Sequence, residues 1–215
     1  EAVVVDKRHI GMGSTAASTA MLQYEIDVPL YKLEKIVGEK NAAQSYLLCY
    51  QSVLDLKDIC KSLKADTGFA LKPSFQYASF KKDVAGLKKE QICRKNIGIQ
   101  TEWLDEKMML DKFGIQRYGG LLSERGGQLD PYAFTHALLY TSIQKGLKVF
   151  DRTKVTDIEH PHKKVILTTE DKRKIQAKYL AIACGYESQQ YISKTVQHLH
   201  ATYAIISEPL SATNL

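Results

Sequence analysis

Two stretches at the start of the chain decide its fold: Val3-Val4-Val5-Asp6-Lys7-Arg8, and then Gly13-Ser14-Thr15-Ala16-Ala17-Ser18-Thr19-Ala20. A β-branched run that ends in an acidic residue predicts a buried parallel strand with a carboxylate at its carboxyl end. The small hydroxylated residues of the second stretch allow a backbone to approach a ligand closely. Their Ser and Thr side chains can also cap a helix whose amide end faces an anion.

Each stretch has a functional and a plain structural interpretation. A carboxylate at the end of such a strand accepts two hydrogen bonds from a ribose diol in dinucleotide-binding folds, which would make Asp6 a ribose ligand. Alternatively, Asp6 is a surface residue at the end of a core strand, and the Ser/Thr/Ala run is a helix that packs tightly. On these residues alone both interpretations stay open.

Length and composition are those of an ordinary globular protein. The 215 residues suffice for one large domain or two small ones. No apolar run approaches the roughly 18 residues of a membrane span, and no signal peptide is expected. Four widely spaced cysteines are typical of reduced thiols in a cytoplasmic protein rather than of disulfides. Because the chain opens directly in a strand without an initiator Met, we expect it to be an internal piece of a longer protein.

The net charge of +6 raises the question of nucleic acid. The basic residues are scattered along predicted helix faces and turns beside acidic residues, as in Arg94-Lys95 and Lys172-Arg173-Lys174. This pattern favours a solvated surface, which suits a phosphate-containing cofactor without requiring DNA or RNA.

Periodicity predicts alternating helices and strands along the chain. Helical spacing favours helices over residues 30–37, 42–63, 82–96, 106–113 and 132–145. Alternating or continuous apolar runs favour strands over residues 71–80, 99–104, 147–150, 153–159, 164–169, 174–178, 179–186 and 202–208. No strand is predicted for the Gly-rich segments 119–122 and 126–131. Asp105 and Asp130-Pro131 are expected to start helices.

Other candidate sites carry weaker signals. Ala183-x-Gly185 ends an apolar run, where a glycine permits close approach of a ligand but also suits a plain turn. His160 and His162, and likewise His198 and His200, are spaced two apart, which on a strand could suit a metal. Because His160-Pro161-His162 is typical of a hairpin tip and no carboxylate or Cys partner is regularly placed nearby, no metal is predicted. His136 is expected to be a half-buried packing residue. Cys184 should remain a neutral, inert thiol at a strand end, and no nucleophile motif is present.

The order of these motifs resembles the FAD-dependent oxidoreductases of the D-amino-acid oxidase and glycine oxidase superfamily. The similarity rests on four separated segments: residues 3–8 with 13–22, Gln128-Leu129-Asp130-Pro131 with the helix after it, Thr153-Lys154-Val155-Thr156-Asp157-Ile158, and Ala181-Ile182-Ala183-Cys184-Gly185-Tyr186-Glu187-Ser188. The resemblance implies an α/β fold, namely a partial FAD-binding Rossmann-like domain with an inserted α+β lobe on the substrate side. It implies FAD-binding segments at residues 1–66 and 129–195, the lobe at 67–128, and a return to that lobe at 196–215.

The same resemblance implies which residues contact FAD: Asp6, Lys7, Arg8, Ser14, Thr15, Ala20, Met21, Leu22, Val155, Ala183 and Gly185. It implies oxidation of a small-molecule amine or amino acid by hydride transfer to flavin, whereas the catalytic residues and the oligomeric state stay unassigned. The family's Gly-x-Gly-x-x-Gly turn should precede Asp6 by about 20 residues and is not in this sequence, so we expect the isolated chain to be inactive and to retain little FAD.

Two alternatives remain open from the sequence. One is a binding or scaffold protein that has a flavoprotein-like fold without turnover. The other is a Rossmann-type enzyme that uses NAD or S-adenosylmethionine, although the Ser/Thr/Ala stretch disfavours it.

Overall fold

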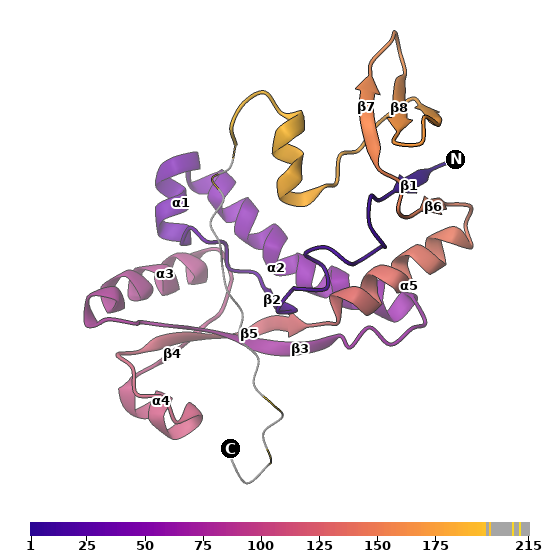
Figure 1. Cartoon of the computed structure of the whole chain (residues 1–215). Coiled ribbons are helices and arrows are strands. Elements are labelled where there is room, and N and C mark those ends of the chain that lie inside the picture. Colours follow the sequence, from indigo (N-terminus) through magenta and orange to yellow (C-terminus); the bar gives the residue numbers. More distant parts are fainter. Residues whose placement is uncertain (197, 199–207, 209–210, 212–215) are drawn as a thin grey trace. The chain divides into compact units, whose positions relative to one another are not determined.

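The computed structural model describes residues 1–196, 198, 208 and 211 of the chain (Figure 1). The chain divides into two compact units. The first unit comprises Glu1–Ala2 and Ile10–Val149, and the second comprises Val3–His9 and the chain from Phe150 onward. The predicted strand 202–208 lies outside the described residues except for Glu208.

The first unit contains strands and helices in alternation. Its elements are β2 (Met21–Gln23), α1 (Leu30–Val37), α2 (Glu39–Ser62), β3 (Ala70–Tyr77), the 3₁₀ helix η1 (Lys81–Asp83), α3 (Val84–Asn96), β4 (Glu102–Leu104), α4 (Glu106–Phe113), β5 (Gly120–Gln128) and α5 (Pro131–Ile143). All five predicted helices are present, and α4 has the predicted bounds.

Local chemistry explains where these helices begin and end. The Asp105 carboxylate accepts a hydrogen bond from the Met108 amide at the start of α4, and Gly114 ends that helix in the left-handed conformation with a φ of 65°. The Asp130 carboxylate caps α5 in the same way through the Ala133 amide. These boundaries follow from side chains within a few residues, which is why the sequence predicts them.

The sheet of the first unit is antiparallel and is organised around β5. Strand β3 pairs along one edge of β5, while β2 and β4 share the other edge, β2 opposite residues 126–128 and β4 opposite residues 120–122. The absence of a predicted strand at 119–128 was therefore wrong. A Cβ at Gly120 would lie 2.7 Å from the Phe75 ring and 2.9 Å from the Gln76 carbonyl oxygen, so glycine here permits close packing inside the strand.

Helices cover the sheet and enclose the core of this unit. Figure 1 shows α1, α2 and α3 on one side of the sheet and α4 on the other. The larger apolar cluster joins residues from the loop after β2, the helices and the loop before β4: Tyr24, Leu30, Ala42, Tyr46, Val53 and Ile99. The long helix α2 contributes Tyr46 and Val53, which lie seven residues apart and therefore share one face.

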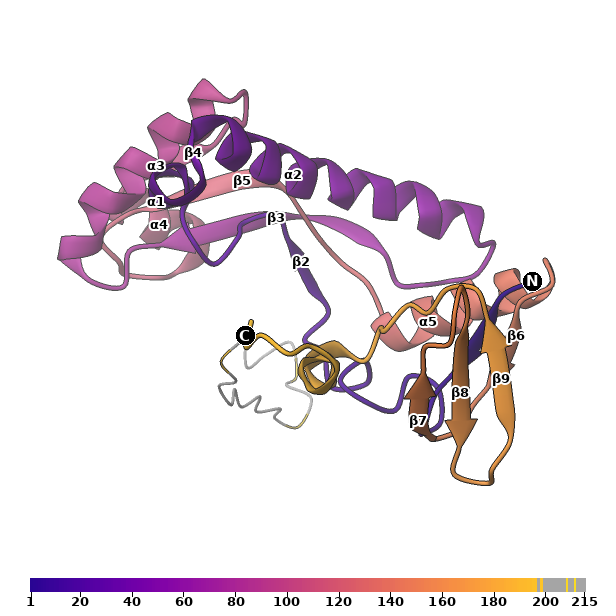
Figure 2. The same ribbon diagram turned by 90° about the horizontal axis from the view of Figure 1, so that it is seen from above.

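The second unit contains β1 (Val3–Val5), the end of β6 (Lys148–Phe150), β7 (Val155–Glu159), β8 (Val165–Thr169), β9 (Lys174–Ala177) and the 3₁₀ helix η2 (Gly185–Tyr191). Strands β7, β8 and β9 form an antiparallel meander, and they lie side by side in Figure 2. His160 and His162 fall in the connection between β7 and β8, as predicted.

Two local predictions were wrong. Residues 179–184 form no strand, and Gly185 begins η2 instead of ending a strand. Tyr179 is 89% exposed, and no strand of the described residues pairs with this segment, so its backbone lacks the partners that a buried parallel strand requires. Residues 13–17 form turns and residues 18–20 an irregular segment that leads into β2, and hence their hydroxyl groups cap no helix.

Two single-residue predictions also need correction. His136 is exposed, with its ring 4.4 Å from that of Tyr132, so it is not a half-buried packing residue. Cys184 is exposed as well, because the strand that would have covered it is absent.

Candidate functional site

The carboxyl end of β1 holds Asp6 in a well-defined backbone position. The Asp6 amide donates to the Phe150 carbonyl at 3.0 Å, and the Asp6 carbonyl accepts from the Thr153 amide at 2.7 Å. The Asp6 carboxylate oxygen Oδ1 accepts from the Arg8 amide at 2.8 Å. Among the described residues Oδ2 has no hydrogen-bond partner, so the half-buried carboxylate keeps an oxygen for a ligand.

Lys7 and Arg8 converge on one carboxylate from η2. The Lys7 ammonium forms an ion pair with Glu187 Oε2, and the Arg8 guanidinium lies 3.3 Å from Glu187 Oε1. The three side chains are 40%, 51% and 44% exposed. The hydrogen bond from Lys7, with a smaller contribution from Arg8, holds the pKa of Glu187 below its usual value, so this carboxylate is charged at neutral pH.

The remaining predicted positions of this unit lie on separate segments. Val155 is half-buried at the start of β7, next to a register shift in its pairing with β8. Ala183 is exposed, and Gly185 has a φ of +55° with open space where a Cβ would lie. Within the described part of the chain no hydrogen bond or ion pair joins Val155, Ala183 or Gly185 to Asp6, but Gly185 is two residues from Glu187. The structure therefore connects Asp6–Arg8 with the η2 segment and leaves Val155 on its own strand.

The other predicted positions lie in the first unit, on the turns before β2 and on β2 itself. The Ala17 amide donates to the Ser14 carbonyl at 3.1 Å, and the Ser18 hydroxyl accepts from the Ala20 amide at 3.2 Å. Ala20 has a φ of 63°, which is strained for a residue with a Cβ. Met21 is 66% exposed at the start of β2.

The residues of these two segments have a chemistry that suits FAD. The free Oδ2 of Asp6 can accept from a ribose hydroxyl, while Lys7 and Arg8 supply positive charge nearby. The hydroxyls of Ser14 and Thr15 form no side-chain hydrogen bond with the other described residues and are free to donate to a ligand. The donor and acceptor set of each unit, taken separately, fits the polar parts of this cofactor.

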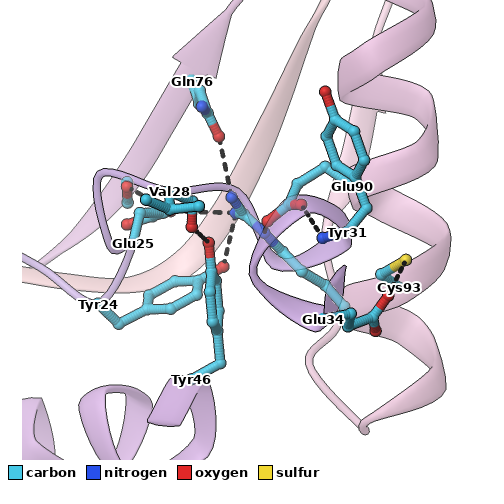
Figure 3. A network of polar contacts seen from close by, with 11 residues as sticks. Tyr24, Glu25, Val28, Tyr31, Glu34, Tyr46, Gln76, Glu90 and Cys93 are labelled. Carbon is cyan, nitrogen blue, oxygen red and sulfur yellow. Dashed lines mark hydrogen bonds and ion pairs between the residues drawn. The ribbon is translucent and has the colours of Figure 1, made fainter. Parts of the chain in front are cut away.

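Sequence reasoning missed a buried polar network in the first unit, shown in Figure 3. Its centre is Arg94 on α3, which the sequence assigned to a solvated face but which is only 1% exposed. The Arg94 guanidinium donates to Glu90 at 2.8 Å, Gln76 at 2.9 Å and the Tyr24 hydroxyl at 3.1 Å. Only the i,i+4 spacing of Glu90 and Arg94 could have indicated part of it.

A second carboxyl group, that of Glu25, completes this network. Glu25 Oε1 accepts from the Ser74 hydroxyl at 2.9 Å and lies 3.3 Å from Arg94, while Glu25 Oε2 is buried without a partner among the described residues. Burial alone lowers the pKa of Arg94, but its hydroxyl and carboxylate partners outweigh burial, so that pKa is raised. The network thus holds one guanidinium against two carboxylates in the interior.

Charges and burial at the edge of the network raise the pKa of two further groups. The Tyr46 hydroxyl donates to the Val28 carbonyl at 3.1 Å, and burial followed by the charge of Glu90 raises the pKa of Tyr46. Burial and the neighbouring Glu34 raise the pKa of the Cys93 thiol to about 11. Both groups are therefore neutral at physiological pH. Because every partner lies between helices and sheet, the network is a structural feature of this unit.

Comparison with known proteins bears on the whole chain. A family model described as FAD dependent oxidoreductase matches residues 1–214. No curated protein sequence matches the chain. Among the described residues no helix is long and apolar enough to cross a membrane.

Solved structures share the fold at low sequence identity. Glycine oxidase from Geobacillus kaustophilus has a TM-score of 0.72 at 20% identity, covering 87% of this chain and 49% of that one. L-proline dehydrogenase from P. horikoshii has a TM-score of 0.64 at 15% identity over 81% and 43% of the two chains. L-α-glycerophosphate oxidase from Mycoplasma pneumoniae with FAD bound has a TM-score of 0.61 at 16% identity over 79% and 43%. The chain therefore spans about half the length or less of these relatives, and the predicted fold class, a partial Rossmann-like α/β domain with an α+β lobe, is confirmed.

Proposed function

This chain belongs to the FAD-dependent oxidoreductase family, and from that premise we propose that it is part of a flavoenzyme that oxidises an amine or amino acid. When bound, FAD supplies the hydride acceptor for such a reaction, and the protein binds and orients cofactor and substrate. Two of the similar structures are named for glycine and L-proline, which favours an amino compound over other substrates. A glycerophosphate oxidase of similar fold makes a hydroxy compound the second class to test.

The observation that carries this proposal is the end of β1. Asp6 is held by hydrogen bonds to Phe150 and Thr153, and its carboxylate keeps one free oxygen. We infer that this oxygen binds a ribose hydroxyl of the adenosine half of FAD. Lys7 and Arg8 flank it, and Val155, Ala183 and Gly185 contact the same half of the cofactor.

The turn segment before β2 takes the other half. The exposed hydroxyl of Ser14 and the half-buried Thr15 donate to the pyrophosphate or ring system, and the backbone from Ala20 to Leu22 lies against the ring. The strained φ of Ala20 supports a functional role, since strain of this kind gathers at ligand sites. We further propose that residues 1–66 and 129–195 belong to the FAD-binding domain, and that 67–128 with 196–215 belong to the substrate-side lobe.

The cofactor assignment is tested by Asp6→Asn in the longer protein that contains this chain. Loss of a charged hydrogen-bond acceptor should weaken FAD binding by about 10- to 100-fold, measured by the quenching of flavin fluorescence on titration. Asp157→Asn, which changes an exposed carboxylate on β7 in the same way, should leave the dissociation constant unchanged. Equal effects of the two substitutions would overturn the ribose assignment.

Activity is tested separately with a panel of amines, amino acids and hydroxy acids, by following the bleaching of flavin absorbance. We expect bleaching with amino compounds. The 215-residue chain alone should retain little FAD and show no turnover, because the family's Gly-rich turn is not among its residues. A longer protein that binds no flavin would refute the proposed function, and binding without bleaching would favour a scaffold role.

A further inference from the structure

The sequence Asp6-Lys7-Arg8 carries two opposed determinants for an adenosine cofactor. A carboxylate at the end of this strand suits a ribose whose 2′-hydroxyl is free, whereas an arginine nearby accommodates a 2′-phosphate. Asp6 carries one negative charge, and Lys7 and Arg8 carry two positive charges. Without a further carboxylate the segment would therefore have a net positive charge, which would attract an additional phosphate.

Glu187 changes this balance. It accepts from Lys7 and Arg8 together, one cation on each carboxylate oxygen, although it follows them by about 180 positions in the sequence. With Glu187 included, two negative charges face two positive ones, and both cations are directed toward a protein carboxylate. The lowered pKa of Glu187 supports a permanent charge at this position.

We propose that Glu187 is a specificity-determining residue, which engages Lys7 and Arg8 and thereby selects adenosine cofactors with a free 2′-hydroxyl over those with a 2′-phosphate. This inference rests on the proposed function, because it takes Asp6 to be the ribose ligand. The Glu187 carboxylate fills the position at which a phosphate would otherwise meet the two cations. A 2′-phosphate would have to displace it and would meet the repulsion of Asp6 as well.

The size of the effect follows from the exposure of the pairs. Exposed ion pairs are weak and are screened by salt, so the selectivity from Glu187 should be about three- to tenfold at low ionic strength and smaller at high salt. If Glu187 only stabilised the position of η2, its loss would weaken the binding of all adenosine nucleotides equally and would leave the selectivity unchanged.

The experiment compares two ligands that differ only by the phosphate, 5′-AMP and adenosine 2′,5′-bisphosphate. Dissociation constants for the longer protein that contains this chain, freed of FAD, are measured by ligand-detected NMR titration, which is suited to weak binding. Glu187→Gln should tighten the bisphosphate relative to AMP by about three- to tenfold. Glu170→Gln, which removes an exposed carboxylate paired with Lys154 at 3.0 Å in the same unit, should leave this ratio unchanged.

Two further variants separate the possible failures. Adding Lys7→Gln and Arg8→Gln to Glu187→Gln should abolish the gain in affinity for the bisphosphate relative to AMP, because the two cations supply that gain. Asp6→Asn should weaken the binding of AMP to the same protein. If Asp6→Asn weakens AMP but Glu187→Gln leaves the ratio unchanged, the selectivity role is overturned while the ribose site stands. If Asp6→Asn has no effect, or neither nucleotide binds, the ribose assignment is overturned and this inference with it.

Discussion

Two clusters of the same chemistry occupy different environments in this chain. In the first unit Arg94 meets Glu90 and Glu25 with exposed fractions of 1%, 1% and 10%, whereas in the second unit Lys7 and Arg8 meet Glu187 with about half of each side chain in water. Buried charges must keep their partners because water cannot replace them, while exposed charges can exchange a partner for solvent or for a ligand. The comparison teaches that burial, rather than residue type, separates an ion pair that holds the fold from one that can take part in recognition.

The largest effect should come from breaking the buried cluster. Arg94→Met leaves two carboxylates in the interior without their cation and should lower the free energy of unfolding by about 3–5 kcal/mol. Urea denaturation followed by circular dichroism measures this change. Arg117→Met, which removes an exposed guanidinium of the same unit, should change the free energy by no more than about 0.5 kcal/mol. A comparable loss in both variants would show that burial is not the deciding factor.

A smaller effect is expected at the edge of the buried cluster. Tyr46→Phe removes the hydroxyl that donates to the Val28 carbonyl at 3.1 Å and leaves that acceptor without its partner. The free energy of unfolding should fall by about 1–2 kcal/mol, measured in the same way. Tyr140→Phe on α5 is the matched control, because that side chain is 68% exposed and its hydroxyl remains in contact with water. A value for Tyr46→Phe no larger than the control would contradict the role of this hydrogen bond.

The smallest effect on stability should come from the exposed cluster. Glu187→Gln should shift the melting temperature only slightly at pH 7, and the difference should shrink in high salt. Because Lys7 and Arg8 hold the pKa of Glu187 below its ordinary 4.5, the stabilisation is complete above that value and is lost as the pH falls through the lowered pKa. The difference in melting temperature between wild type and variant should therefore narrow as the pH falls below 4.5 and vanish once the pH is well below the lowered pKa. A large shift at pH 7 would mean that this cluster is as structural as that of Arg94.

Features with local causes were predictable from the sequence. The bounds of α4 follow from Asp105 and Gly114, and the start of α5 follows from Asp130 and Pro131, because each cap acts within a few residues. The segment 119–128 was not predictable in this way. Its glycines indicate a loop when viewed locally, yet they are required in β5, where Phe75 packs directly against Gly120.

The candidate site likewise contains one residue that the sequence indicates and one that it does not. Asp6 is recognisable because a carboxylate after a β-branched run has a known use, and its role as a ribose ligand remains a prediction. Glu187 carried no signal of its own, because its partners lie about 180 residues away. The expected strand over 179–186 would have placed it differently, and in the structure it belongs to η2.

By itself, the sequence determined the family, the five helices of the first unit and the caps at the start of α4 and α5, since these depend on patterns within short windows and on motif order. Only the tertiary structure decided which charges are buried. Helix α3 presents Glu90 and Arg94 in a sequence as polar as any solvated helix, and both become interior residues because α1, α2 and the sheet close around them. Desolvation depends on neighbours distant in sequence, so no local pattern indicates it.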